Sequence, residues 1–106
     1  MSDQEQLESL ISRSEEARLD FLRIDLELSK TFADLANTEM EIGELDAARR
    51  VLAKAERGYA TIQRMVLNLD HPHQQNEILQ RLGELRAAID TAHQQLGVRS
   101  MAQDPA

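Results

Sequence analysis

Two of the three histidines are close enough in sequence to suggest a metal site, because His71 and His73 flank Pro72. Stable zinc sites usually need three or four protein ligands, and Asp70 is the only further ligand nearby. We therefore interpret residues 70–73 as a turn in which Asp70 or His71 caps a helix that begins with the proline. No metal site and no cofactor is predicted.

The third histidine, His93, is followed four residues later by Gly97. This spacing resembles the phosphorylated helix of histidine-phosphotransfer domains, and the resemblance implies a phosphorelay through His93. That family has a lysine before the glycine, where this chain has Leu96, and too little chain follows to complete its four-helix bundle. An exposed helix histidine is the better interpretation, with the relay as an alternative.

Carboxylates are plentiful, at nineteen residues, but they do not form a catalytic pattern. General acid–base catalysis needs carboxylates with shifted pKa values in a water-poor pocket, whereas most of these fall on the polar side of the first expected helix. No histidine has a glutamate three residues earlier, so the di-iron Glu-x-x-His pattern is absent. Without cysteine there is no thiol chemistry. We predict that the chain is not an enzyme.

Four arginines share the polar side of a helix expected over residues 45–69: Arg49, Arg50, Arg57 and Arg64. Such a group is a candidate binding site for an acidic protein or peptide partner. The acids Asp46 and Glu56 lie among them, so a mixed, solvated face is the alternative interpretation.

The overall charge limits the classes of partner. The formal net charge is −7, and nucleic acids or anionic lipids require clustered Lys and Arg. No run approaches the ~18 apolar residues of a membrane-spanning helix, and the acidic start MSDQEQLES is unlike a secretory signal. We expect neither nucleic acid nor membrane as a partner, and a cytoplasmic location.

The spacing of apolar residues predicts an all-α fold, an antiparallel three-helix unit. The helices are expected at residues 3–42, 45–69 and 73–96, with Gly43 and Gly97 as stops. They form one domain over residues 1–97, and residues 98–106 are expected to be a disordered tail. Gly58, inside the second helix, suggests a close approach between helices.

The first helix carries two apolar stripes. One follows a seven-residue register: Leu7, Phe21, Leu28, Leu35 and Ile42. The other begins at Leu19 and continues through Leu22, Leu26, Ala33, Ala36 and Met40. Together they cover roughly 220° of the helix, whereas packing on one neighbour needs about 100°. Residues 19–42 should therefore be buried between at least two partners.

The bend between the first two helices combines small residues with two leucines at defined places: Leu35, Ala36, Gly43, Ala48, Leu52 and Ala55. This arrangement resembles a single tetratricopeptide (TPR) repeat over about residues 29–62, a helix–turn–helix in which small residues allow close backbone contact. The resemblance implies binding of a peptide or helix in a groove. Glu39 stands at an aromatic position of that family, so a generic antiparallel hairpin is the alternative. Tyr59 extends the same packing surface.

The lengths of the helices leave one end uncovered. At ~1.5 Å per residue the first helix is about 60 Å long and the second about 37 Å, so the second reaches back only to about residue 18. The residues left over form a candidate self-association patch: Leu7, Leu10, Ile11 and Ser14. We predict that these arms pair, antiparallel, in a symmetric homodimer. Alternatively, the arm frays or folds over as a short helix.

These observations favour a non-enzymatic protein–protein interaction or assembly module that presents a helical surface and self-associates. The alternatives are a relay protein that uses His93 and a purely structural oligomer subunit.

Overall fold

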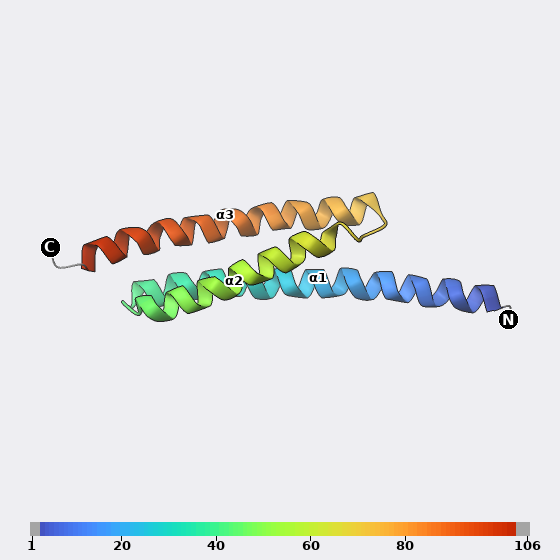
Figure 1. Ribbon diagram of the computed structural model, residues 1–106, viewed down its shortest axis with the longest axis horizontal. Coiled ribbons are helices and arrows are strands. Elements are labelled where there is room, and N and C mark those ends of the chain that lie inside the picture. The colour runs from blue at the N-terminus through green and yellow to red at the C-terminus, as the bar shows by residue number, and fades with distance from the viewer. Residues whose placement is uncertain (1–2, 104–106) are drawn as a thin grey trace.

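The computed structural model describes residues 3–103, except for the side chains of residues 11 and 12. This part of the chain forms three helices: α1 (Asp3–Glu41), α2 (Leu45–Val66) and α3 (Pro72–Gln103). Figure 1 shows α2 folding back along α1, and α3 returning beside both, in a rod of 73 × 20 × 16 Å. The predicted all-helical chain of three helices is thereby confirmed.

The turn between α1 and α2 depends on Gly43, whose φ of 83° lies in the left-handed region that glycine tolerates best. The N–H of Glu44 donates to the carbonyl of Glu39 at 2.9 Å, and the N–H of Gly43 donates to that of Met40 at 3.1 Å. This pair of bonds is the Schellman motif, which satisfies the last carbonyls of a helix. The chain therefore reverses direction within three residues.

The turn between α2 and α3 begins earlier than the sequence predicted. α2 ends at Val66 rather than at Leu69, and Leu69 stays buried in the connection. α3 begins at Pro72, where the N–H missing from proline is not needed. The N–H of Gln75 donates to the carbonyl of His71 at 3.0 Å, so His71 is the residue that precedes the helix.

α3 is longer than predicted, and this corrects two expectations. The helix passes through Gly97 without stopping and continues to Gln103. Residues 98–103 are therefore helical rather than part of a disordered tail, and residues 104–106 lie outside the described residues. A glycine inside a helix costs only about 1 kcal/mol relative to alanine, so other contacts can outweigh it.

Those contacts come from the other two helices. The guanidinium of Arg99 donates to the backbone carbonyl of Met40 at 3.0 Å, and Ser100 accepts a hydrogen bond from Arg49 of α2 at 2.7 Å. The carbonyl of Met40, in the last turn of α1, thus accepts a second hydrogen bond besides the one from the N–H of Gly43. The C-terminal end of α3 is thus bonded to the last turn of α1 and to the N-terminal part of α2.

The core is aliphatic and takes only one of the two stripes of α1. The stripe that begins at Leu19 is buried, whereas the seven-residue register is exposed, from 40% at Leu35 to 67% at Ile42. Burial of residues 19–42 on both stripes was therefore a wrong prediction. Its physical reason is that α2 and α3 contact each other as well as α1, so they share one side of α1.

The small residues lie where the helices come closest. Ala36, Ala48 and Ala55 are completely buried. At Gly58 an added Cβ would lie 1.9 Å from the Oγ of Ser29, a distance no real contact allows, so the close approach suggested for this glycine is confirmed. Ser29 is itself buried, which the apolar pattern did not indicate.

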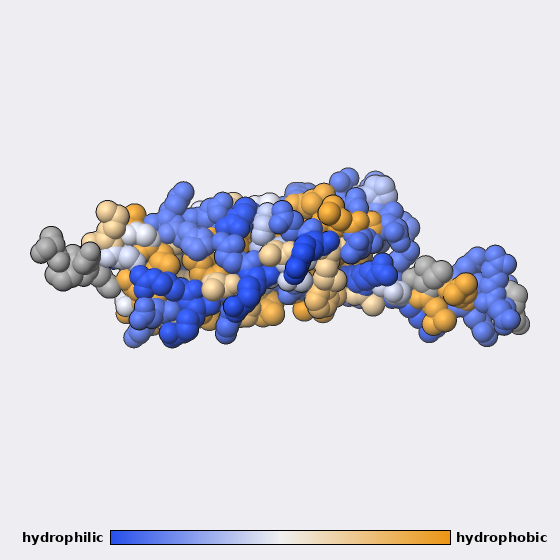
Figure 2. Space-filling view, in the orientation of Figure 1, coloured by the Kyte–Doolittle hydropathy of each residue, from blue (hydrophilic) through white to orange (hydrophobic). Residues whose placement is uncertain are grey.

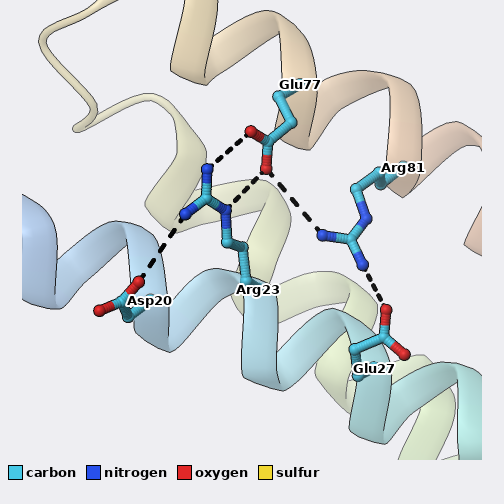
Figure 3. A network of polar contacts seen from close by, with 5 residues as sticks. All are labelled: Asp20, Arg23, Glu27, Glu77 and Arg81. Atoms are coloured by element: carbon cyan, nitrogen blue, oxygen red, sulfur yellow. Dashed lines mark hydrogen bonds and ion pairs between the residues drawn. The ribbon is translucent and has the colours of Figure 1, made fainter.

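Ion pairs fix the position of α3 against the other helices. Figure 3 shows Arg23 of α1 in two hydrogen bonds to Glu77 of α3, at 2.8 and 2.9 Å, and Glu27 paired with Arg81. These side chains are partly exposed, and such pairs contribute about 0–1 kcal/mol each. Their main effect is on the register of α3 rather than on stability. Within residues 3–103 no helix has the length and apolar character needed to cross a membrane.

Candidate helix-docking surface

The outer stripe of α1 is a row of large apolar side chains that no other helix covers. Its members are 40–67% exposed: Leu7, Leu10, Phe21, Ile24, Leu28, Leu35 and Ile42. Figure 1 shows the N-terminal end of α1 projecting beyond the turn between α2 and α3, and Figure 2 shows apolar side chains on that projecting end. Contiguous exposed apolar surface of this extent usually marks an interaction site.

The spacing of the stripe is that of a coiled coil. Five of its members lie seven residues apart or at multiples of seven, and Leu10 and Ile24 lie three residues after register positions. These are the a and d positions of a heptad, which stay on one side of a helix when two helices supercoil. The register is interrupted at Ser14, which is exposed.

Of the three remaining d positions of the stripe, one is Ala17 and two are threonines. The hydroxyl of Thr31 donates to the carbonyl of Glu27 at 2.9 Å, and that of Thr38 to the carbonyl of Asp34 at 3.3 Å. Because both hydroxyls already have partners within α1, covering them with a second helix leaves no unsatisfied donor. Between Phe21 and Ile42 the stripe can therefore be buried without leaving a threonine hydroxyl unpaired.

One flank of the outer stripe is acidic, and the flank towards α2 carries both signs of charge, because Asp25 of α1 lines the same groove as Lys54 and Arg57. On the flank away from α2 lies the acid row, four exposed residues seven apart: Asp20, Glu27, Asp34 and Glu41. On the other flank lies α2 with the basic row of exposed residues: Arg50, Lys54, Arg57 and Arg64. The position of α2 follows from the groove that Phe21, Phe32 and Lys54 line together. Lys54 Nζ lies 5.7 Å from the ring centre of Phe32.

The structure separates the four arginines that the sequence grouped together. Arg49 faces α3, with hydrogen bonds to Asp46 and Ser100, whereas the other three belong to the basic row. Arg49 therefore differs from the other three in its contacts, and the binding of a partner by these arginines stays a prediction. The difference follows from the ~100° turn per residue, which places Arg49 and Arg50 on different sides of α2.

Of the residues predicted to pack inside the hairpin, most are buried and one is exposed. Ala36, Ala48, Leu52 and Ala55 are at most 1% exposed, and Tyr59 packs against the core. Leu35 is 40% exposed and belongs to the outer stripe, so its assignment to the hairpin interior was wrong. It lies one residue, and therefore about 100°, from the buried Ala36.

The predicted self-association patch lies on the projecting arm. Leu7 and Leu10 are 57% and 60% exposed, and Ser14 is exposed. The side chain of Ile11 lies outside the described residues. The same surface continues along the body of α1 through Phe21, Ile24 and Leu28. The sequence analysis had expected these three side chains to be buried. The seven-residue register was the available signal, but it did not say which stripe faces the core.

Two of the three histidines lie against single carboxylates rather than in a ligand cluster. His71 Nε2 is 3.2 Å from the carboxylate of Glu15, and His93 Nε2 is 2.8 Å from that of Glu56. Among the residues that the structure describes, no three His, Cys, Asp or Glu side chains gather as metal ligands would.

Glu56 is the centre of the polar contacts between α2 and α3. It accepts two hydrogen bonds from Arg86, at 2.9 and 3.0 Å, and Arg86 also lies over the ring of Tyr59 at 4.9 Å. The hydrogen bonds from Arg86, with a smaller contribution from His93, lower the pKa of Glu56 from 4.5 to about 2. These contacts hold α3 on α2, on the side away from the outer stripe.

The lowered pKa of Glu56 predicts a pH dependence of stability. Because this pKa is lower in the folded chain, the charged carboxylate stabilises the fold above pH 4.5, and this contribution is lost as the pH falls towards 2. The difference in unfolding free energy between the wild type and Glu56→Gln should therefore shrink over that interval, measured by urea titration. Arg86→Gln should abolish most of this dependence. A difference that stays constant with pH contradicts the assignment.

Comparison with protein-family models, with curated proteins and with solved structures found no similar protein. Function must therefore be inferred from the residues of the chain itself.

Proposed function

We propose that this protein is a non-enzymatic assembly module that self-associates by docking the outer stripe of α1 against another helix. The observation that supports the proposal is the coiled-coil spacing of side chains that α2 and α3 leave exposed. Burying an apolar side chain fully is worth roughly 1.5–3 kcal/mol, so leaving seven large ones half exposed is unfavourable unless a partner covers them.

The remainder of the fold suits the role of a scaffold. α2 and α3 pack on one side of α1, and the ion pairs of Glu77 and Glu56 hold α3 in place. α1 is therefore braced along its body while its outer stripe stays accessible. We retain the TPR-like interpretation of residues 29–62 as part of the proposal, supported by the burial of Ala36, Ala48 and Ala55. A cytoplasmic location and a protein, rather than nucleic-acid, partner complete it.

Light scattering coupled to size exclusion tests the proposal on the full chain. The wild type should show a mass near twice the 12.0 kDa of one chain. Leu28→Glu places a charge in the middle of the outer stripe and should shift the protein to the monomer, because an unpaired buried carboxylate is strongly unfavourable. Leu67→Glu is the matched control, since Leu67 is 74% exposed in the turn after α2.

The control variant should associate as the wild type does. A wild type that remains monomeric at every concentration contradicts the proposal, as does a dimer that both variants weaken equally.

A further inference from the structure

We infer that the partner of the outer stripe is the reversed stripe of a second copy, so that the projecting arm of each chain, residues 3–18, lies against the body of α1 in the other. This inference rests on the proposed function and adds the identity of the partner, its direction and its register. It follows from the order of small and large side chains along the stripe.

Side-chain size changes abruptly along the outer stripe. At the base of the arm the stripe has the small residues Ser14 and Ala17, and its next two positions hold the large residues Phe21 and Ile24. All four are exposed, the last two at 48% and 67%. A partner must therefore offer large side chains opposite the first pair and small ones opposite the second, because the centres of interfaces are packed as closely as protein interiors.

The stripe read in the opposite direction meets this requirement. In an antiparallel pair each a position faces a d position of the other helix. When the two-fold axis is level with residue 19, every layer near it contains at least one large side chain, and the symmetry repeats each contact. The facing pairs are Phe21 with Ala17, Ile24 with Ser14, and Leu28 with Leu10.

The other arrangements match the sizes poorly. In a parallel pair each position faces its own copy, so Ser14 and Ala17 form two consecutive layers without a large side chain, followed by Phe21 against Phe21. An antiparallel pair whose overlap is one heptad longer sets Ser14 against Thr31, and Phe21 against Ile24. Both arrangements combine underfilled layers with overfilled ones, and each kind of mismatch lowers stability.

The same register gives Asp25 a partner of opposite charge. Its carboxylate lines the groove that contains Phe21 and Phe32, and burial raises its pKa. In the part of the chain that the structure describes, neither Asp25 nor Arg18 has an ion pair. Both lie one residue after a d position, on the flank towards α2, and like flanks face each other in an antiparallel pair. Arg18 of each copy therefore comes level with Asp25 of the other.

The opposite flank is acidic, and the arm brings a base to it. Arg13 of the arm comes level with Glu27, which pairs with Arg81 of its own chain and is still 67% exposed. Asp20 faces its own copy near the axis, and Arg23 of the same chain, at 3.8 Å, offsets that repulsion. The charges are thus compatible with the register that the side-chain sizes select.

The arrangement also supports both projecting arms. Figure 1 shows that α2 and α3 do not reach the N-terminal end of α1, so the arm has no neighbour within its own chain. In the pair, each arm packs on a stretch of α1 that α2 and α3 hold from the other side. Isolated short helices are marginally stable in water, so a braced neighbour stabilises the arm more than a second unsupported arm does. In this respect the inference differs from the pairing of arm with arm expected from the sequence.

Cysteine cross-linking tests the direction and the register, because the chain contains no cysteine of its own. A mixture of full-length Ser14→Cys and Ile24→Cys should form the mixed disulfide readily under mild oxidation, identified by its intact mass. Neither variant alone should form a covalent dimer at a similar rate, because equal positions lie roughly 15 Å apart along the axis and a disulfide needs Cα atoms within about 7 Å. Glu16→Cys, exposed but off the stripe, replaces Ser14→Cys as the matched control and should cross-link slowly.

Charge reversal tests the contact between Arg18 and Asp25. Asp25→Lys should raise the dissociation constant about tenfold or more, because it opposes Arg18 at two places in each dimer. This variant also moves the net charge of −7 towards zero, which by itself favours association, so weaker association identifies a specific contact. Arg18→Glu combined with Asp25→Lys should restore most of the affinity. Glu44→Lys, the same change of charge at an exposed position in the turn after α1, should not weaken association.

The outcomes separate this inference from the proposed function. A dimer that Leu28→Glu dissociates, but in which Ser14→Cys and Ile24→Cys each cross-link alone, is parallel, which overturns the inference and leaves the assembly module intact. A dimer that forms no mixed disulfide overturns the register in the same way. Mixed cross-linking with an affinity that charge reversal leaves unchanged overturns the contact between Arg18 and Asp25. A chain that is monomeric at all concentrations overturns both proposals.

Discussion

Leu22→Ala should lower the free energy of unfolding by about 2–5 kcal/mol, the range measured when a large buried side chain is truncated. Leu22 is completely buried on the core side of α1, and its removal leaves a cavity that neighbouring helices cannot fill without moving. The loss should be the same at every protein concentration, because the side chain lies inside one chain. Urea titration followed by circular dichroism measures it.

Leu28→Ala is the matched control, since it makes the same chemical change six residues further along the same helix. Leu28 is 47% exposed, so at concentrations where the chain is monomeric its truncation should change the free energy of unfolding by about 0.5 kcal/mol or less. At higher concentrations the effect should grow if the outer stripe is covered by a partner. Equal losses for both variants in the dilute protein would mean that the outer stripe belongs to the core.

Gly58→Ala should destabilise the fold, although alanine is the better helix former by about 1 kcal/mol. The new Cβ would lie 1.9 Å from the Oγ of Ser29 and 3.1 Å from its Cβ, so the hydroxyl must rotate away inside the core and the contact between α1 and α2 must widen by a few tenths of an ångström. Overpacking of this kind typically costs about 1–3 kcal/mol and outweighs the gain in propensity. Thermal unfolding should therefore show a lower midpoint for this variant.

Gly83→Ala should change the stability in the opposite direction from Gly58→Ala. An added Cβ at Gly83 meets no atom within 4 Å, so only the propensity changes, and stability should rise by up to about 1 kcal/mol. Ser29→Ala in the Gly58→Ala background should recover part of the loss, because it removes the closest atom. If Gly58→Ala stabilises the chain as Gly83→Ala does, the two helices are further apart than described.

Local signals in the sequence predicted the helices and their breaks well. Gly43 and Pro72 act through their own backbone restrictions, so their effects can be read without knowing the fold. The alanines at the bend were recognisable because small residues recur where backbones meet. The limits of α2 and α3 were less accurate, since contacts between helices decide whether a last turn forms. The hydrogen bond from Arg99 to the carbonyl of Met40, for example, holds the last turns of α3 against α1.

The orientation of α1 could not be predicted in the same way. Periodicity identifies two stripes but not which of them α2 and α3 cover, because the answer depends on how those helices pack against each other. The candidate site had the same limit: Leu7 and Leu10 were visible from helix length alone, whereas the exposure of Phe21 and Leu28 required the fold. The placement of the acid row and the basic row relative to the outer stripe likewise depends on where α2 packs.

The projecting arm has a consequence for the order of the chain. Forming a helix turn without tertiary contacts yields little net free energy, so an unsupported segment unwinds and rewinds far more often than the braced part of the same helix. The helical hydrogen bonds of α1 should accordingly be less stable in the projecting arm than in the body, although the helix is continuous. If two copies associate through these projecting segments, each stabilises the helical conformation of the other. Assembly would then weaken steeply on heating, because joining and local ordering occur in one step.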